Sequence, residues 1–205
     1  MAKIKFSKGE LKKQRDSLKQ YRRYLPTLQL KKQQIQMEIL RQHVMLQERH
    51  AKLTAAMTNA VKWAGLLYEN NIFDDKWVRP KRVSKSFKNI AGVELPVFER
   101  CEFGIAEYDL FIAPLWVDAA IEELKTIISV REEVKVLEEG VAVLRRELRV
   151  TTQRVNLFEK VKIPDAEEAI RRIKIYIGDQ MANAVGRSKA AKRKIEAVFA
   201  HEVGV

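Results

Sequence analysis

The sequence predicts a mainly α-helical protein in which two long helices form an antiparallel intramolecular coiled coil with a small central β-hairpin region. Three observations predict this class. Apolar residues recur with a heptad period in both halves of the 205-residue chain. Charged residues make up 32% of the chain, which holds only 8 Gly and 5 Pro, so helix formers outnumber turn formers. Only the middle shows short alternating segments around a glycine.

The first predicted helix follows residues 11 to 67. Seven of nine steps of seven in this stretch are large and apolar, and a second series is offset by three. The apolar members are Leu11, Leu18, Leu25, Ile39, Leu46, Leu53 and Leu67, with Tyr21, Leu28 and Ile35. This a/d pattern is well formed between 18 and 46 and is diluted by polar residues on either side. Pro26 interrupts the pattern. A proline inside a helix costs about 3 kcal/mol but is tolerated in the first turn. We therefore expect the long helix to begin near Thr27, with a shorter helix before it.

The central segment predicts a β-hairpin. Alternating residues near Val83 and Phe87 are followed by NIAGVELP and then by VFERCEF. Two strands of about five or six residues around a Gly-containing loop fit this pattern. The residues singled out for the hairpin are Asn89, Gly92, Val93 and Pro96. Because Pro96 lacks a backbone N–H, its strand should be an edge strand.

The second predicted helix repeats the heptads more cleanly, with Pro114 expected in its first turn. One series runs from Ala120 to Val155 and the other from Val130 to Phe158. After Phe158 the phase slips, beside a proline, and a new series holds Ile163, Ile170, Ile177 and Ala184. We expect a kink or a local change of supercoil there rather than a helix end, because no Gly follows before Gly178.

These elements predict one elongated domain with three parts. Residues 1–70 form the N-terminal coiled-coil helix, 71–113 the hairpin segment and 114–205 the C-terminal coiled-coil helix. If the helices pair antiparallel, both ends of the chain lie at the same end of the rod.

The net charge of +12 is concentrated at the chain ends. Residues 1–60 hold 14 Lys or Arg and 4 Asp or Glu. A charge gathered at one place favours a directed electrostatic partner. The candidate contact residues are Lys12, Lys13, Arg15, Arg187, Lys189, Lys192 and Arg193. Nucleic acid is the alternative partner, but no aromatic stacking platform accompanies these residues, which favours an acidic protein surface.

No constellation predicts catalysis. The phosphate-loop, dinucleotide and serine-hydrolase motifs are absent from the sequence. His43 and His50 are seven residues apart, whereas helical metal ligands are three or four apart. Cys101 stands among acids, which disfavours a reactive thiolate. We therefore expect no catalytic residue, cofactor or metal. The start lacks a secretory signal, and the longest apolar run, 110–117, is short of the roughly 20 residues of a membrane span. A cytoplasmic protein without direct membrane insertion is expected.

Three segments resemble one family. The stretch TTQRVNLFEKVKIPDAEEAIRRIKIYI, residues 151–177, resembles the C-terminal signature of the D subunit of V-type and A-type ATPases and ATP synthases. Its matching residues are Arg154, Val155, Asn156, Leu157, Glu159, Ile163 and Pro164. KNIAGVELPVF at 88–98 is similar to the family's hairpin segment, and YLPTLQLKKQQIQ at 24–36 to its N-terminal pattern. The matches follow the family's order from near residue 24 to near 194.

The resemblance implies a non-catalytic central rotor shaft in a rotary ATPase. Its partners would be the catalytic A and B subunits, the small F subunit and the socket subunit of the membrane rotor, in a complex peripheral to the membrane on its cytoplasmic side. Rotation would couple ion translocation to ATP synthesis or hydrolysis, and a bend at Pro164 would present different faces to three catalytic sites. The alternatives are a free-standing basic coiled-coil adaptor and a nucleic-acid-binding rod.

Overall fold

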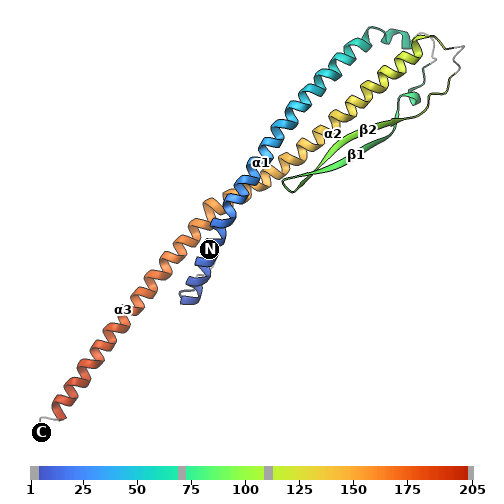
Figure 1. Ribbon diagram of the computed structural model, residues 1–205. Helices are drawn as coiled ribbons and strands as arrows, with labels where there is room; N and C mark the ends of the chain where they lie inside the picture. Colours follow the sequence, from blue (N-terminus) through green and yellow to red (C-terminus); the bar gives the residue numbers. More distant parts are fainter. Residues whose placement is uncertain (1–4, 69–72, 109–112, 203–205) are drawn as a thin grey trace. The chain divides into compact units, whose positions relative to one another are not determined.

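A computed structural model describes residues 5–68, 73–108 and 113–202 of the chain (Figure 1). Its elements are helix α1 (Lys8–Val61), the 3₁₀ turns η1 (Ala64–Tyr68) and η2 (Asp75–Trp77), strands β1 (Pro80–Ile90) and β2 (Val93–Phe103), helix α2 (Trp116–Leu157), the π-helical turn η3 (Phe158–Lys162) and helix α3 (Ile163–Glu202). Contacts divide the chain into two units. The central unit is Leu30–Thr152, and the terminal unit is Met1–Gln29 with Gln153–Val205.

In the central unit, α1 and α2 lie antiparallel to each other. Lys31 Nζ lies 2.9 Å from a carboxylate oxygen of Glu147, and Arg49 Nε lies 2.8 Å from one of Glu133. As the residue number rises on α1, the number of its partner on α2 falls, which is the signature of antiparallel pairing (Figure 1). The predicted heptad positions of both helices are buried or half-buried here. The predicted mainly α fold with paired long helices is confirmed.

The core of the central unit joins both helices to the hairpin. Ile35 of α1, Leu144 of α2 and Val93 and Leu95 of β2 form one buried cluster, and Ile35 and Leu144 are fully buried. Because a two-stranded hairpin is marginal alone in water, this packing against helices accounts for its order. The hairpin also contacts α2 through Lys85, whose Nζ lies 2.7 Å from Glu139.

The hairpin is confirmed, but its strands are longer than predicted. Each strand has 11 residues, and they pair antiparallel from Pro80 opposite Phe103 to Ile90 opposite Val93, with two register shifts. The two-residue connection has φ of 53° at Ala91 and 75° at Gly92, as a type I′ turn requires. Asn89 Oδ1 accepts a hydrogen bond of 3.0 Å from the Gly92 N–H. The bulges allow pairing to continue past the segments in which alternation is visible in the sequence.

The expected start of the long helix near Thr27 is wrong, because α1 runs without interruption from Lys8 to Val61 with Pro26 inside it. Packing on both sides of the proline offsets the hydrogen bond that Pro26 cannot donate, since Leu25 and Leu28 are half-buried. The Thr27 hydroxyl donates to the Tyr24 carbonyl at 2.7 Å, which satisfies another carbonyl in this turn.

Helix α2 also begins later than predicted. Its first residue is Trp116, so Pro114 precedes the helix rather than lying in its first turn. The Val117 N–H donates to the Pro114 carbonyl at 3.0 Å, which turns the chain into the helix. In the described residues, no helix combines the length and the apolar character that a membrane crossing needs.

In the terminal unit, the start of α1 pairs with the end of α2, η3 and the start of α3. The Tyr21 and Phe158 rings meet edge to face at 5.4 Å, and the Phe6 and Tyr176 rings lie 5.1 Å apart. The half-buried residues of α1 in this unit follow the predicted heptads from Leu11 to Leu28. The start of α1 is capped by Ser7, whose Oγ accepts from the Glu10 N–H at 3.2 Å.

Replacement of Leu144 by alanine should lower the free energy of unfolding by about 2–5 kcal/mol, because the side chain is fully buried in the central cluster. Urea denaturation followed by circular dichroism measures the change. The matched control is Leu115→Ala, because Leu115 is 97% exposed and its replacement should change stability by less than about 0.5 kcal/mol. Equal effects of the two substitutions would contradict the assignment of the core.

Candidate functional site

The π-turn η3 lies where the heptad phase slips. The Ile163 N–H bonds to the Phe158 carbonyl, five residues earlier, so the turn holds one residue more than an α-helical turn. An unshifted register would turn Lys162, Asp165 and Arg172 toward α1, but all three are exposed. The shifted register instead places the apolar residue that follows each of them against α1: Ile163 is half-buried, Ala166 is buried and Ile173 is fully buried. One inserted residue therefore accounts for the phase slip.

The residues of the family-like motif occupy different faces around this turn. Val155 is buried and Ile163 is half-buried, so both belong to the seam against α1. Arg154 and Asn156 are exposed, and Pro164 is exposed in the first turn of α3, where a missing N–H is tolerated. The helix passes from η3 into α3 without a break, as the sequence predicted.

The N-terminal basic candidates lie in the paired part of the terminal unit. Lys12, Lys13 and Arg15 are exposed on α1. One seam of α1 is occupied by α3, because the guanidinium of Arg22 lies 2.6 Å from the carboxylate of Glu167. The three candidate side chains therefore project from a two-helix face.

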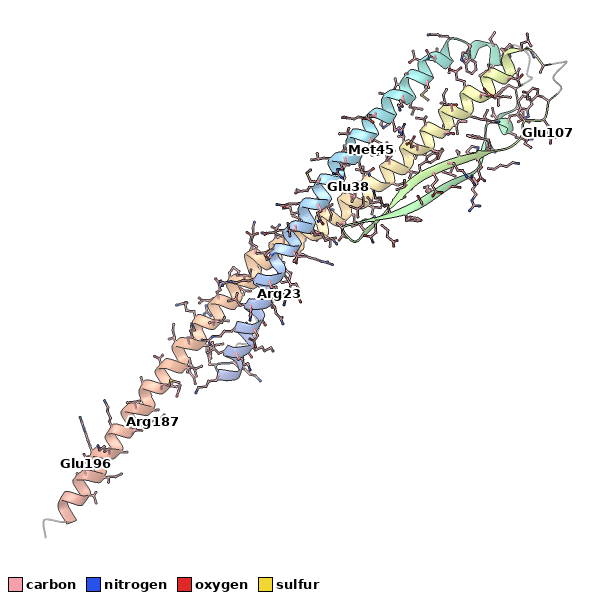
Figure 2. All side chains as sticks on the ribbon, in the orientation of Figure 1. Arg23, Glu38, Met45, Glu107, Arg187 and Glu196 are labelled. Atoms are coloured by element: carbon pink, nitrogen blue, oxygen red, sulfur yellow. The ribbon has the colours of Figure 1, made fainter. Side chains whose placement is uncertain are left out.

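The C-terminal basic candidates lie on a single helix. Since the Phe6 ring contacts Tyr176, the described part of the N-terminal segment ends beside Tyr176. Arg187 follows 11 residues later, about 16 Å farther along α3. Every residue from Gly178 to Val198 is exposed, and no described part of the terminal unit lies beside Arg187 and Glu196 (Figure 2). The two basic clusters therefore lie one after the other along the terminal unit and do not gather at one end. Lys12, Lys13 and Arg15 form the first basic band, and Arg187, Lys189, Lys192 and Arg193 form the second basic band.

The unpaired part of α3 carries an apolar stripe that was not predicted as a site from the sequence. Met181, Val185, Ile195 and Val198 are each more than half exposed. Their spacing continues the seam that Ile170 and Ile173 bury against α1, but the described residues provide no partner for it. The sequence shows these apolar residues at steps of three and four, but lysines and arginines lie between them, so the segment was interpreted only as basic. Arg187, Lys189, Lys192 and Arg193 surround this stripe, and Lys192 lies 3.6 Å from Glu196.

Charge pairing stabilises α3 where it is still packed against α1. The guanidinium of Arg171 donates two hydrogen bonds of 2.8 Å to Glu168, and Arg172 Nε donates one of 2.7 Å. These bonds lower the pKa of the Glu168 carboxyl to about 2. The two arginines reach the same acid because spacings of three and four residues share one helix face.

The hairpin candidates lie in the central unit and serve its fold. Asn89 and Gly92 form the turn, while Val93 is buried in the core. Pro96 lies opposite Phe87 in a two-stranded sheet, in which both strands are edges. Among the described residues, no group of three His, Cys, Asp or Glu side chains is arranged to hold a metal ion.

Comparison with known proteins identifies the family. The family model for the ATP synthase D subunit matches residues 10–193, which include nearly all of the paired helices, the hairpin and the second basic band. The chain belongs to the ATP synthase D-subunit family. The resemblance drawn from the three sequence segments is confirmed, and with it the expectation of a non-catalytic stalk subunit.

Curated relatives in this family match the chain over nearly their whole length. The V-type ATP synthase D subunit of Borreliella burgdorferi is 45% identical over 195 residues, which cover 95% of this chain and 96% of the relative. The V-type ATP synthase D subunit of Chlamydia pneumoniae is 30% identical, with 94% and 93% covered. That of Chlamydia muridarum is 32% identical, with 94% and 96% covered. The matched regions include both helices and the hairpin.

We expect the heptad slip, and not the proline, to maintain the π-turn. In Pro164→Ala, the Ile163 N–H should still bond to the Phe158 carbonyl, because the buried residues of α3 require the inserted residue. Deletion of the exposed Val161 should convert the turn to α-helix. Crystal structures of the two variants give this hydrogen-bond pattern directly. An ordinary α-helical turn in Pro164→Ala would contradict the explanation.

The Glu168 carboxyl should titrate with a pKa of about 2. Because the folded pKa is lower than the ordinary value of 4.5, the stabilisation from its arginine partners is complete only at pH values well above 4.5, and it is lost as pH falls through 4.5 toward 2. NMR titration of the side-chain carboxyl carbon measures the midpoint. In the Arg171→Gln, Arg172→Gln variant the midpoint should rise toward the ordinary value. An unchanged midpoint would show that the arginines are not its cause.

Proposed function

We propose that the chain is the central-stalk rotor subunit of a V-type ATP synthase. It couples ion translocation through the membrane ring mechanically to ATP synthesis or hydrolysis in a hexamer of catalytic A and B subunits. The observation that carries the proposal is the unpaired end of α3, with its exposed apolar stripe and basic residues, on a chain of the D-subunit family. The chain is then a peripheral part of a membrane-bound complex on its cytoplasmic side.

The properties of the helices fit a part that transmits torque. In each unit the a/d seam joins two antiparallel segments, so neither can rotate or splay without exposing apolar surface. The described residues of the terminal unit do not give the single-helix part of α3 this support. Because most helical stability in proteins comes from packing an amphipathic face, the exposed segment from Gly178 to Val198 suits the bore of a surrounding assembly. A bend at the π-turn would present different helix faces to three catalytic sites during rotation.

The end of the central unit near the start of α2 suits the remaining partners. Ile105 and Leu115 are at least 90% exposed. Exposed large apolar side chains at one end of a unit favour contact with another protein. The small F subunit and the socket subunit of the membrane rotor are the partners proposed for the hairpin-bearing unit.

The first experiment is purification of the tagged chain from gently solubilised membranes of its native cell, with mass spectrometry of what accompanies it. Recovery of A and B subunits with a small F-like protein supports the rotor proposal. Recovery of unrelated proteins alone favours a free-standing coiled-coil adaptor. Recovery of nucleic acid, with binding that weakens steeply as salt rises, favours the nucleic-acid-binding rod.

Reversal of the second basic band should weaken the contact with the hexamer. The variant carries Glu at positions 187, 189, 192 and 193, in place of Arg187, Lys189, Lys192 and Arg193. Four exposed charge contacts predict a loss of about 1–4 kcal/mol in binding to purified A/B hexamer, and a lower ratio of ions pumped to ATP hydrolysed. The matched control exchanges Lys and Arg at the same four positions and keeps the charge. A reversed variant that binds and couples like the control would contradict a role for these charges.

A further inference from the structure

The terminal unit contains two irregular helical turns, one on each side of its seam. In α1, Pro26 has no N–H, so the carbonyl of Arg22 lacks the donor that an α-helix would supply. In the second helix, the π-turn η3 bonds the Ile163 N–H to the Phe158 carbonyl. Both turns therefore depart from the regular pattern of α-helical hydrogen bonds.

These two irregular turns lie against each other. The Tyr21 ring meets the Phe158 ring edge to face at 5.4 Å, and the Arg22 guanidinium lies 2.6 Å from the Glu167 carboxylate. The turn of α1 that begins at Arg22 is therefore opposite η3. We call residues 21–26 and residues 156–165 together the π-layer.

The seam is least buried in the π-layer. Along α2, successive buried residues are never more than seven positions apart. Val155 and Ala166 are buried, but they are eleven positions apart, and no residue between them is buried. Only Phe158 and Ile163 are half-buried there. Because few buried contacts lower the free energy of local opening, the π-layer is the paired segment that opens most easily.

The segments on either side of the π-layer are held in place by burial. Val155 is buried before it, and Ala166, Ala169, Ile170 and Ile173 are buried after it. Rotation of α3 about its own axis would bring charged residues to the seam, which is costly. Burial therefore fixes the rotation of both flanking segments, but it does not fix the position of the inserted residue between them.

A π-turn can move along a helix by an exchange of hydrogen bonds between the fourth and the fifth preceding carbonyl. Each residue that the turn passes rotates by about 100° around the helix axis. A buried side chain would oppose this rotation, but residues 156–165 include none. The ion pair of Arg22 with Glu167 is exposed on both sides, so it contributes little to holding the turn in one place.

We propose that the π-layer is a flexible hinge, in which the inserted residue moves between positions within residues 156–165 while the seams on either side stay closed. The paired helices then bend and twist more easily here than elsewhere in the terminal unit. The hinge is a property of the chain by itself, but its use, to yield under torque, rests on the proposed function. A flexible π-layer in a chain that recovers no A or B subunits would therefore remove the rotor and leave the hinge.

Hydrogen exchange of the purified full-length chain, resolved by residue with NMR spectroscopy, tests the proposal. The backbone amides among residues 159–165 should exchange at least about tenfold faster than those of residues 166–173, although the latter lie nearer the end of the chain. Equal protection of the two segments would overturn the proposal. Protection that falls steadily from residue 153 to residue 198 would also overturn it, because it would show fraying from the end of α3.

Deletion of Val161 removes the inserted residue and should slow exchange among residues 159–165 at least about tenfold. The matched control is Val161→Ala, which keeps the number of residues and should retain the fast exchange. Circular dichroism should show equal helix content in the two variants. Equal exchange in both would show that the inserted residue is not the cause of the opening, and would overturn the proposal.

Distances between spin labels test the hinge with the π-turn left intact. One pair of labels, at Gln153→Cys and Lys174→Cys, spans the π-layer, and the other, at Glu122→Cys and Val143→Cys, lies within α2. All four positions are exposed, each pair is 21 residues or about 31 Å apart, and Cys101→Ser removes the native thiol. The first pair should give a distance distribution at least about 1.5 times as wide as the second in electron–electron double resonance. Equal widths would overturn the proposal.

Discussion

The burial of one apolar seam between antiparallel helical segments is the interaction on which the rest of this structure depends. Neither long helix is expected to stand alone, because most helical stability in proteins comes from packing an apolar face against a partner. Pairing removes the seam from water and fixes the register through pairs such as Lys31 with Glu147. These ion pairs are half-exposed and add specificity more than stability. The seam also keeps Pro26 inside a continuous helix, although proline alone would end it.

The π-turn shows how strongly the seam constrains the backbone. Between Val155 and Ile173 the sequence holds one residue more than the heptad period allows. A uniform α-helix would have to bury Lys162, Asp165 and Arg172, which costs far more than one irregular turn. The chain adopts the less favourable backbone and keeps its apolar residues against α1. The position of the irregular turn is thus set by side-chain burial on either side of it.

Outside the seam, some helix faces are covered by another part of the chain and others are not. The hairpin completes one side of the central helix pair through Val93 and Leu95. Exposed apolar side chains remain on α1, such as Met37 and Leu40, and on the otherwise basic single-helix end of α3. These two uncovered faces belong to different units, and each follows the same 3–4 spacing as the buried seam. Exposed apolar faces of this kind are suited to contact with another protein.

The sequence by itself determined the helix class, the heptad seam, the hairpin around Gly92 and the site of the phase slip, because each depends on local periodicity or on the conformation of one or two residues. Only the tertiary structure decided that α1 continues through Pro26, that the strands reach 11 residues and that the phase slip is a π-turn. In these three places the local conformational preference of the sequence is weak or opposes the observed structure, and packing against a distant segment decides the outcome. The exposed stripes were likewise recognisable only after the buried seam was located, since an apolar residue at heptad spacing looks the same in sequence whether or not the chain provides its partner.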